Sequence, residues 1–142
     1  MPYQGLQNGL YLARQKSNIK PDLIYHYGVI DIGNVLNISE AKANMPMVIH
    51  QAIPSIRVDF LNSTGSWEQM GRISETNLDT AKVRIQEAQK NPKYDLFGNN
   101  CEHFARYVIT GVKESWQLQA VVGILFLCAL CYSLMTGKGV KL

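Results

Sequence analysis

The sequence predicts an α+β protein in which a small antiparallel sheet packs on helices, followed by a C-terminal hydrophobic helix. Two observations lead to this fold class. Runs rich in aromatic and β-branched residues fill the first half of the chain, and apolar residues at helical spacing fill the part after residue 77. Strands that come first and helices that come later are typical of α+β proteins with an antiparallel sheet.

Four segments of the first half have the composition of β-strands. The clearest begins at Leu23 and is rich in aromatic and β-branched residues up to Gly33, where a turn signal ends it. Another alternates apolar Ile56 and Val58 with charged neighbours, as a half-buried strand does. The expected strands are residues 9–14, 23–32, 47–53 and 55–61, with an Asn-rich loop at 34–46 and a turn-rich loop at 62–71.

Two amphipathic helices are predicted next. The first begins near Asn77 and ends before Pro92, because apolar residues recur at i, i+3, i+7 and i+10 between these points. The second covers Cys101–Ile109 and ends at Gly111. Asn100 can cap its N-terminus, which places the cysteine in the first turn of the helix.

The C-terminal segment predicts a membrane anchor. No residue from Ser115 to Gly137 is charged, and apolar side chains lie all round the expected helix. A helix of this length rises roughly 34 Å, which is enough to cross a hydrocarbon core of about 30 Å, with Trp116 and Tyr132 near the interfaces. The alternative is a buried helix or an oligomer contact. We therefore expect a folded domain at 1–115, a tail anchor at 116–136 and a short basic tail at 137–142.

Composition limits the classes of function. The chain has 142 residues, enough for one compact domain and an appendage, and its net charge is +3. Acidic and basic residues nearly balance before residue 115, so a nucleic-acid partner is not expected. The first residues contain no apolar stretch typical of a signal peptide, and we expect the folded domain to face the cytoplasm. The sequence indicates no oligomeric state.

Cys101 is the most informative candidate for chemistry. A thiol in the first turn of a helix lies at the positive end of the helix dipole, which favours the thiolate and, with a histidine nearby, lowers the thiol pKa from about 8.5. Unpaired backbone N–H groups at the same place can hold an oxyanion. We therefore expect Cys101 to be a nucleophile that needs a base within hydrogen-bond reach.

His26 and His50 each lie in the middle of a predicted apolar strand. Two neighbouring strands can present both rings on one face, opposite the helix that carries Cys101. This arrangement makes a Cys-His-His triad possible, in which His50 holds the ring of His26. The alternative is a pair of core histidines whose ring nitrogens bind backbone carbonyls.

The segment Asn100–Phe104 reads NCEHF, and with its surroundings Tyr94–Ala105 it closely resembles the lecithin retinol acyltransferase-like family. This family includes small phospholipase A and acyltransferase proteins. The segments His26–Gly33 and Val48–His50 are similar to the two segments that carry the family's histidines. The resemblance covers roughly residues 22–117.

The resemblance implies a role for each of these residues. Cys101 would be the nucleophile, His26 the general base and His50 the orienting third member, on a circularly permuted papain-like (NlpC-like) fold. The activity implied is thiol-dependent acyl transfer on phospholipids through an acyl-cysteine intermediate, with no cofactor and no metal. The partners would be a phospholipid acyl donor, an acyl acceptor and a membrane, and residues 1–115 would be the catalytic domain.

Three other functions stay open. The same triad can act on an amide, as in a papain-like amidase or peptidase. His26 and His50 are 24 positions apart, roughly twice the spacing of the best-known members, which keeps open a catalytically silent interaction module with the same fold. A zinc site formed by Cys101 and the two histidines has acceptable ligand types, but no pair has the short spacing of zinc motifs.

The remaining reactive side chains have simpler interpretations. His103 follows Cys101 by two positions and does not share its helix face, so we expect it to be structural and to bind a nearby carbonyl. Cys128 and Cys131 lie within the apolar helix, where packing is the simplest role and lipidation is possible near an interface.

Overall fold

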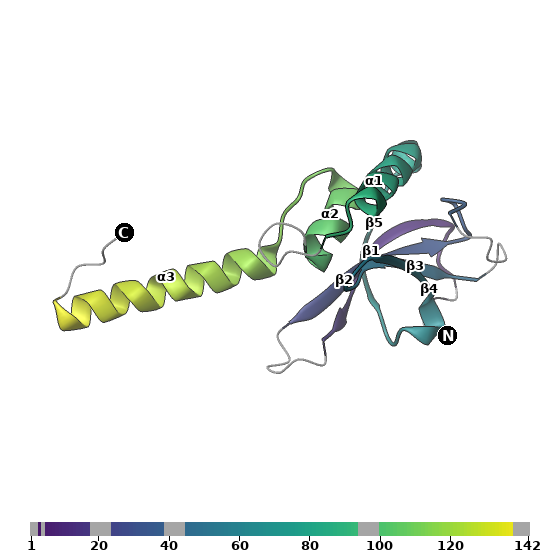
Figure 1. Ribbon diagram of the computed structural model, residues 1–142. Helices are drawn as coiled ribbons and strands as arrows, with labels where there is room; N and C mark the ends of the chain where they lie inside the picture. Colours follow the sequence, from purple (N-terminus) through teal and green to yellow (C-terminus); the bar gives the residue numbers. More distant parts are fainter. Residues whose placement is uncertain (1–2, 4, 18–23, 39–44, 94–99, 138–142) are drawn as a thin grey trace.

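A five-stranded antiparallel sheet carries helices on one face, and a long helix leaves the domain at its C-terminal end (Figure 1). The structure is a computed structural model, and it describes residue 3 and residues 5–17, 24–38, 45–93 and 100–137. The sheet order is β4-β3-β2-β1-β5. The elements are β1 (Gly9–Lys16), β2 (Tyr25–Ile32), β3 (Met47–Gln51), β4 (Ile56–Phe60), β5 (Glu68–Arg72), α1 (Leu78–Lys90), α2 (Cys101–Thr110) and α3 (Trp116–Thr136), with short 3-10 turns at Leu61–Ser63 and Glu75–Asn77.

Alternation along the strands divides the core into two layers. Tyr27 and Val29 of β2 pack with α1 and α2 on one face of the sheet. Ile30 and Ile32, which point the other way, pack with Trp67 on the second face. The larger layer contains the buried helix residues Ala81, Ile85, Phe104, Ala105 and Val108.

These elements confirm the predicted α+β class and the antiparallel sheet, but they correct one segment. The expected turn-rich loop at 62–71 contains the edge strand β5, which pairs with β1 through an irregularity between Leu12 and Ala13. Most residues of β5 are exposed, so it has no apolar alternation by which the sequence could reveal it. Part of the Asn-rich loop, residues 39–44, lies outside the described residues.

The start of α2 is fixed by its own side chains. Asn100 accepts a hydrogen bond from the backbone N–H of His103, and the His103 ring accepts one from the backbone N–H of Asn100. This reciprocal pair is a capping box, which satisfies two backbone donors at the helix end. At the other end Gly111 adopts the left-handed conformation, with φ of 82°, as glycine does most easily. The predicted cap and the predicted end are both confirmed.

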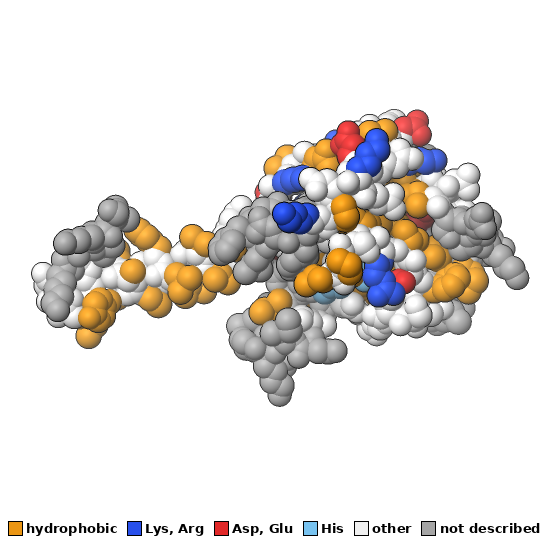
Figure 2. Space-filling model, in the orientation of Figure 1, with side chains coloured by type: hydrophobic (Ala, Val, Ile, Leu, Met, Phe, Trp, Pro, Cys, Tyr) orange, Lys and Arg blue, Asp and Glu red, His pale blue; other side chains and the backbone are white. Residues whose placement is uncertain are grey.

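Helix α3 stands away from the domain (Figure 1). Its 21 residues match the bounds of the predicted C-terminal helix, and no residue of the helix is buried. Figure 2 shows apolar side chains along the face of α3 that is in view. Among the described residues it is the one helix long and apolar enough to cross a membrane. The alternative of a buried C-terminal helix does not fit this exposure. Most of the expected basic tail, residues 138–142, lies outside the described residues.

Candidate active site

The two predicted histidines meet on the face of the sheet that α1 and α2 leave uncovered. His26 Nε2 and His50 Nδ1 are 2.8 Å apart. The rings are nearly perpendicular, and both lie beside Trp67, with ring centroids 5.6 and 6.0 Å from it. None of the contacts of the two rings in the described part of the chain is to a backbone carbonyl, so the interpretation as carbonyl-bound core histidines does not hold.

A carboxylate completes this contact on the far side of His50. His50 Nε2 lies 2.9 Å from Asp59 Oδ2, and Arg57 Nη2 lies 3.1 Å from Asp59 Oδ1. Burial raises the pKa of Asp59, but the hydrogen bonds from His50 and Arg57 outweigh burial and lower it. Asp59 is therefore a carboxylate at neutral pH, and it can only accept.

The carboxylate determines which nitrogen carries each proton. Because Asp59 accepts, His50 Nε2 must donate, and in a neutral His50 the other nitrogen, Nδ1, must then be an acceptor. His26 Nε2 consequently donates to it, which leaves the lone pair of His26 on Nδ1. Burial, and secondarily repulsion from His50, lowers the pKa of His26 to about 4, so the ring is neutral at pH 7. The neutral His26 ring therefore has a lone pair on Nδ1, although its lowered pKa makes it a weaker base than an ordinary histidine.

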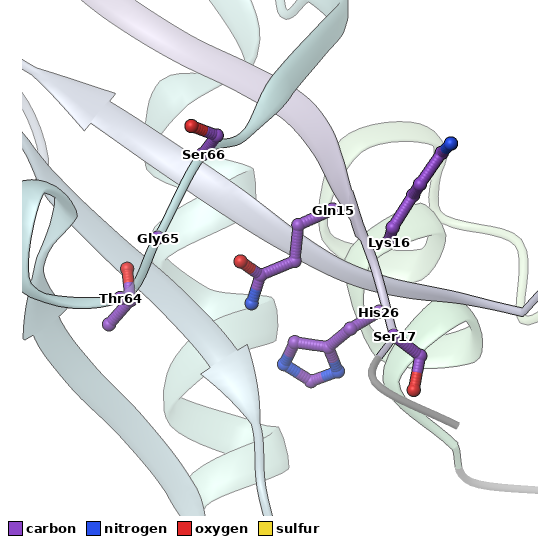
Figure 3. Close-up of a pocket in the computed structure, with 7 residues that line it drawn as sticks. All are labelled: Gln15, Lys16, Ser17, His26, Thr64, Gly65 and Ser66. Carbon is purple, nitrogen blue, oxygen red and sulfur yellow. The ribbon is translucent and has the colours of Figure 1, made fainter. Parts of the chain in front are cut away.

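His26 opens onto a polar cleft. The cleft has a volume of about 670 Å³ and lies between the ends of β1 and β2 and the segment before β5. Figure 3 shows the His26 ring and the Gln15 side chain pointing into this space. Its lining residues, all polar except one glycine, are Gln15, Lys16, Ser17, His26, Thr64, Gly65 and Ser66.

The first half of β2 has one edge that no strand covers in the described part of the chain. β1 pairs with the whole of β2, whereas the pairing with β3 is confined to Val29–Asp31. At this edge the side chain of Gln117, from the first turn of α3, takes the place of a strand. Its Oε1 accepts from Tyr25 N at 2.7 Å, and its Nε2 donates to Tyr25 O at 3.0 Å.

Cys101 lies at the same edge of β2, near the backbone of Tyr27, which is two residues after Tyr25. The backbone N–H groups of Tyr27, Glu102 and Cys101 itself are close enough to the thiol to favour its ionised form. Burial nevertheless dominates and raises the thiol pKa, so the expected lowering by the helix dipole is wrong. The three N–H groups around one sulfur are the type of donor set that holds an oxyanion.

The structure therefore brings two of the three predicted site residues, His26 and His50, into contact and places the third, Cys101, near the backbone next to His26. α2 does not cover the histidine face, since it packs on the face of Tyr25 and Tyr27. The thiol lies at the strand edge between the two faces, near the peptide that joins His26 to Tyr27. Among the described residues, Cys101 makes no hydrogen bond to either imidazole.

The thiol faces a second, apolar cavity of about 270 Å³. This cavity is separate from the polar cleft and opens where α3 leaves the domain. Its walls come from the start of β2, the start of α2 and the first two turns of α3. The lining residues are Ile24, Tyr25, Asn100, Cys101, Ser115, Gln117, Leu118 and Val121.

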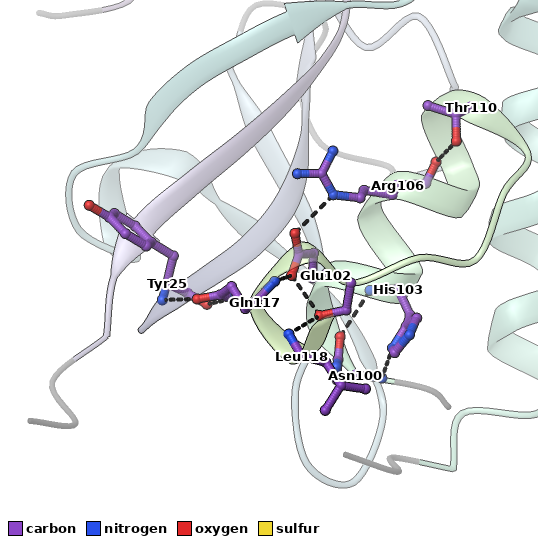
Figure 4. A network of polar contacts seen from close by, with 9 residues as sticks. Tyr25, Asn100, Glu102, His103, Arg106, Thr110, Gln117 and Leu118 are labelled. Atoms are coloured by element: carbon purple, nitrogen blue, oxygen red, sulfur yellow. Dashed lines mark hydrogen bonds and ion pairs between the residues drawn. The ribbon is translucent and has the colours of Figure 1, made fainter. Parts of the chain in front are cut away.

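Glu102 is a site residue that the sequence analysis did not assign. Its carboxylate is completely buried and binds Arg106 Nε at 2.9 Å, Ser115 Oγ at 2.6 Å and Gln117 N at 3.1 Å (Figure 4). Burial raises its pKa, but these three donors outweigh burial and lower it. Glu102 thus ties the thiol's helix to the start of α3. The i,i+4 spacing of Glu102 and Arg106 was the available signal.

The structure also describes the surroundings of the other side chains singled out in the sequence. His103 is structural, as expected, but its Nδ1 accepts from the Asn100 backbone N–H in the capping box. Cys128 and Cys131 are exposed on α3, which makes packing within the domain impossible for them. Within the described ranges no group of three His, Cys, Asp or Glu side chains is placed to hold a metal ion.

Comparison with known protein families identifies the family of this chain. Neither the curated proteins nor the solved structures contain a match to this chain. A family model described as lecithin retinol acyltransferase matches residues 18–114, more than half of the chain, and this range includes Cys101, both histidines and Asp59. The chain therefore belongs to the lecithin retinol acyltransferase family.

Proposed function

We propose that this protein is a membrane-anchored thiol enzyme that transfers acyl groups from phospholipid esters through an acyl-Cys101 intermediate. Membership of the family indicates acyltransferase or phospholipase-type chemistry in general. The observation that carries the finer proposal is the hydrogen-bonded chain from Asp59 through His50 to His26, which leaves the lone pair of His26 on Nδ1. The thiol lies next to the peptide of that same residue.

In the first step His26 Nδ1 takes the proton of Cys101, and the sulfur attacks the carbonyl carbon of a lipid ester. The carbonyl oxygen becomes an oxyanion, for which the N–H groups of Tyr27 and Glu102 are the nearest donors. When the oxyanion collapses, the bond from the acyl carbon to the alkoxide oxygen breaks. The alkoxide takes the proton back from His26, and a lysophospholipid leaves while the acyl group stays on sulfur as a thioester.

In the second step an acceptor enters, loses its proton to His26 and attacks the thioester carbonyl. Water as acceptor gives a fatty acid, and an amine or hydroxyl acceptor gives an amide or ester; in each case the sulfur leaves as the thiol after regaining a proton from His26. His26 carries a positive charge in both transition states. His50 and the Asp59 carboxylate stabilise this charge through the two hydrogen bonds of 2.8 and 2.9 Å.

Two specific observations favour a second candidate, a catalytically silent interaction module on the same fold. Burial raises the thiol pKa, and in the described residues the sulfur has no hydrogen bond to an imidazole. A silent module would keep the capping box and the buried Glu102 contacts for stability. It would show no covalent chemistry at Cys101.

The deciding experiment uses the full chain in phosphatidylcholine vesicles. Intact mass is measured for an acyl adduct, and the lipids are analysed for lysophosphatidylcholine, fatty acid and new acylated products. We expect an adduct and lysophospholipid with the parent chain, and neither with Cys101→Ser or His26→Gln. Cys131→Ser, which changes an exposed thiol on α3, is the matched control and should behave as the parent does.

Each outcome selects one function. An adduct that depends on Cys101 supports acyl transfer, and the product then distinguishes hydrolysis from transfer. A folded parent chain that forms neither adduct nor product supports the silent module. Turnover of amide substrates without turnover of lipid esters would support the papain-like amidase instead.

A further inference from the structure

We infer that the first two turns of α3 form a wall of the acyl pocket and act as a rigid mount, which fixes Cys101 at the depth of the ester bonds in the leaflet that holds the anchor. This inference rests on the proposed function. It goes beyond a simple anchor, because a flexible tether would also keep the domain near the membrane.

The pocket itself is built partly from the anchor helix. Leu118 and Val121 lie on successive turns of α3, and both line the cavity that Cys101 faces. The volume of about 270 Å³ is near the lower end of ligand pockets, so the cavity fits the part of an acyl chain next to its ester. A pocket with this wall cannot keep its shape if the helix moves relative to α2.

Several contacts prevent such movement. Glu102, on the same helix as the thiol, binds both the Ser115 hydroxyl and the Gln117 backbone N–H. The Gln117 side chain makes two hydrogen bonds with the backbone of Tyr25. The guanidinium of Arg106 lies 3.9 Å from the centre of the Trp116 ring, as in a cation–π contact. The start of α3 is thus joined to β2 and to α2 at once.

The length of the apolar helix sets the depth of the pocket. The 21 residues of α3 rise about 31 Å, which matches a hydrocarbon core of about 30 Å. From Val121 to the end of the helix only about 24 Å remain, which is too short to cross. All 21 residues are therefore needed to cross, so the first two turns must lie in the outermost part of the hydrocarbon core, and the pocket that they line lies at its boundary. Lipid ester groups lie at this boundary between head groups and hydrocarbon.

The test separates a rigid mount from a flexible tether. A linker of twelve Gly and Ser residues is inserted after Val121, and the segment beyond it is lengthened with leucine to 21 residues so that the anchor still spans. We expect turnover of bilayer phosphatidylcholine to fall at least tenfold, while turnover of monomeric short-chain phosphatidylcholine stays within twofold. Equal bilayer turnover with and without the linker would overturn the inference.

A matched pair of substitutions tests the pocket wall. Leu118→Trp fills the cavity, whereas Leu130→Trp makes the same change three turns further along the same helix, where the side chain is exposed. We expect Leu118→Trp to lower turnover of long-chain esters at least tenfold and Leu130→Trp to leave it unchanged. Equal effects of the two substitutions would exclude α3 from the pocket.

A measurement of depth does not depend on activity. In a chain with Cys128→Ser and Cys131→Ser, a small maleimide fluorophore is attached to Cys101 and quenched by lipids brominated near the start of the acyl chain. We expect strong quenching in the chain without a linker and at least threefold weaker quenching with it. If quenching follows this pattern but no variant turns over any lipid, the rigid attachment of α3 is supported and the proposed function is contradicted. If the linker leaves quenching unchanged, the rigid attachment itself is contradicted.

Discussion

The Asp59 carboxylate determines which ring nitrogen carries the proton in His50 and in His26. Without an acceptor at His50 Nε2, either nitrogen of His50 could carry the proton, and His26 would have no fixed tautomer. The register of the sheet places Asp59 within reach: it lies on β4 opposite Val48, two positions from His50 on the same face of β3. The protonation of His26 is thus set by a residue on a third strand.

Replacing Asp59 with Asn should therefore impair the proposed reaction without unfolding the protein. An amide nitrogen facing His50 Nε2 would donate, reverse both tautomers and put the proton of His26 on Nδ1. We expect Asp59→Asn to lower kcat for lipid esters by roughly 10²–10⁴-fold. The rate of Cys101 alkylation at pH 10 should not change, because there the thiol ionises without a base. Asp79→Asn, on the exposed start of α1, is the control and should leave kcat unchanged. A kcat of Asp59→Asn within twofold of the parent value would contradict the assignment.

The pH dependence of Cys101 reactivity tests the thiol pKa. Because burial raises this pKa, the thiol form dominates at pH 7. The rate of alkylation with iodoacetamide should therefore keep rising as the pH is increased beyond about 8.5, the ordinary pKa of a cysteine. The measurement uses the Cys128→Ser, Cys131→Ser background. In urea the midpoint should return to about 8.5. A fast reaction that is already constant below pH 7 would instead indicate a thiolate–imidazolium pair.

The lowered pKa of His26 also affects stability. In the unfolded chain His26 binds a proton near pH 6.5, whereas in the folded protein it binds one only near pH 4. The free energy of unfolding should therefore fall as pH decreases from about 6.5 to 4, by up to about 3 kcal/mol. Urea unfolding at pH 4 and 7 measures this, and His26→Gln should remove most of the difference. An unchanged pH dependence in that variant would assign the effect to other groups.

Reactive residues could be predicted from the sequence, but their supporting contacts could not. Cys101 and the two histidines are identifiable from motif and strand context, because such residue types are unusual in apolar strands and helix starts. Asp59 looks like an ordinary exposed residue of an alternating strand, and only the pairing of β3 with β4 brings it to His50. The burial that raises the thiol pKa arises only when the chain folds, and the cavity beside Cys101 is lined by residues of β2 and α3 that the motif does not contain.

At the scale of elements, the Glu102–Arg106 pair on α2 helps to fix how α2 packs against the start of α3. Its carboxylate is buried with three donors, so a loss of charge leaves Arg106 without its partner in a dry environment. We expect Glu102→Gln to lower the free energy of unfolding by about 3–5 kcal/mol in urea titrations. Glu87→Gln, an exposed change on α1, should stay within about 0.5 kcal/mol. A loss below about 1 kcal/mol for Glu102→Gln would mean that the pair is not structural.

The helices and the strands were predictable to different degrees. α1, α2 and α3 were found with nearly their observed bounds, because apolar periodicity and clear end signals such as Asn100 and Gly111 mark them. Four strands were found because three of them bury a continuous or alternating set of apolar residues and β4 half-buries Ile56 and Val58 in alternation. β5 was missed because most of its residues are exposed and show no apolar pattern, whereas its place in the sheet comes from pairing with β1.

On the scale of the whole molecule, the exposed apolar helix predicts integral membrane association. Leu125 and Leu127 lie near the middle of α3, where each arginine would cost about 2.5–3.5 kcal/mol on insertion. We expect the parent chain to stay with membranes after alkaline carbonate extraction, and Leu125→Arg, Leu127→Arg to appear in the supernatant. Val83→Arg, an exposed apolar residue on α1, should remain with the membranes. Release of the parent chain would contradict the anchor.

The side chain of Gln117 has a consequence for solubility. It forms hydrogen bonds with the N–H and C=O of Tyr25, and these backbone groups could otherwise pair with a strand from another molecule. A fragment that ends at residue 115 would lose this protection and expose hydrogen-bonding groups beside the apolar Ile24 and Tyr25. Such a fragment should self-associate through β2 as it is concentrated. A soluble form that keeps residues 116–121 should remain monomeric, so the boundary for crystallisation or assay lies within α3 and not before it.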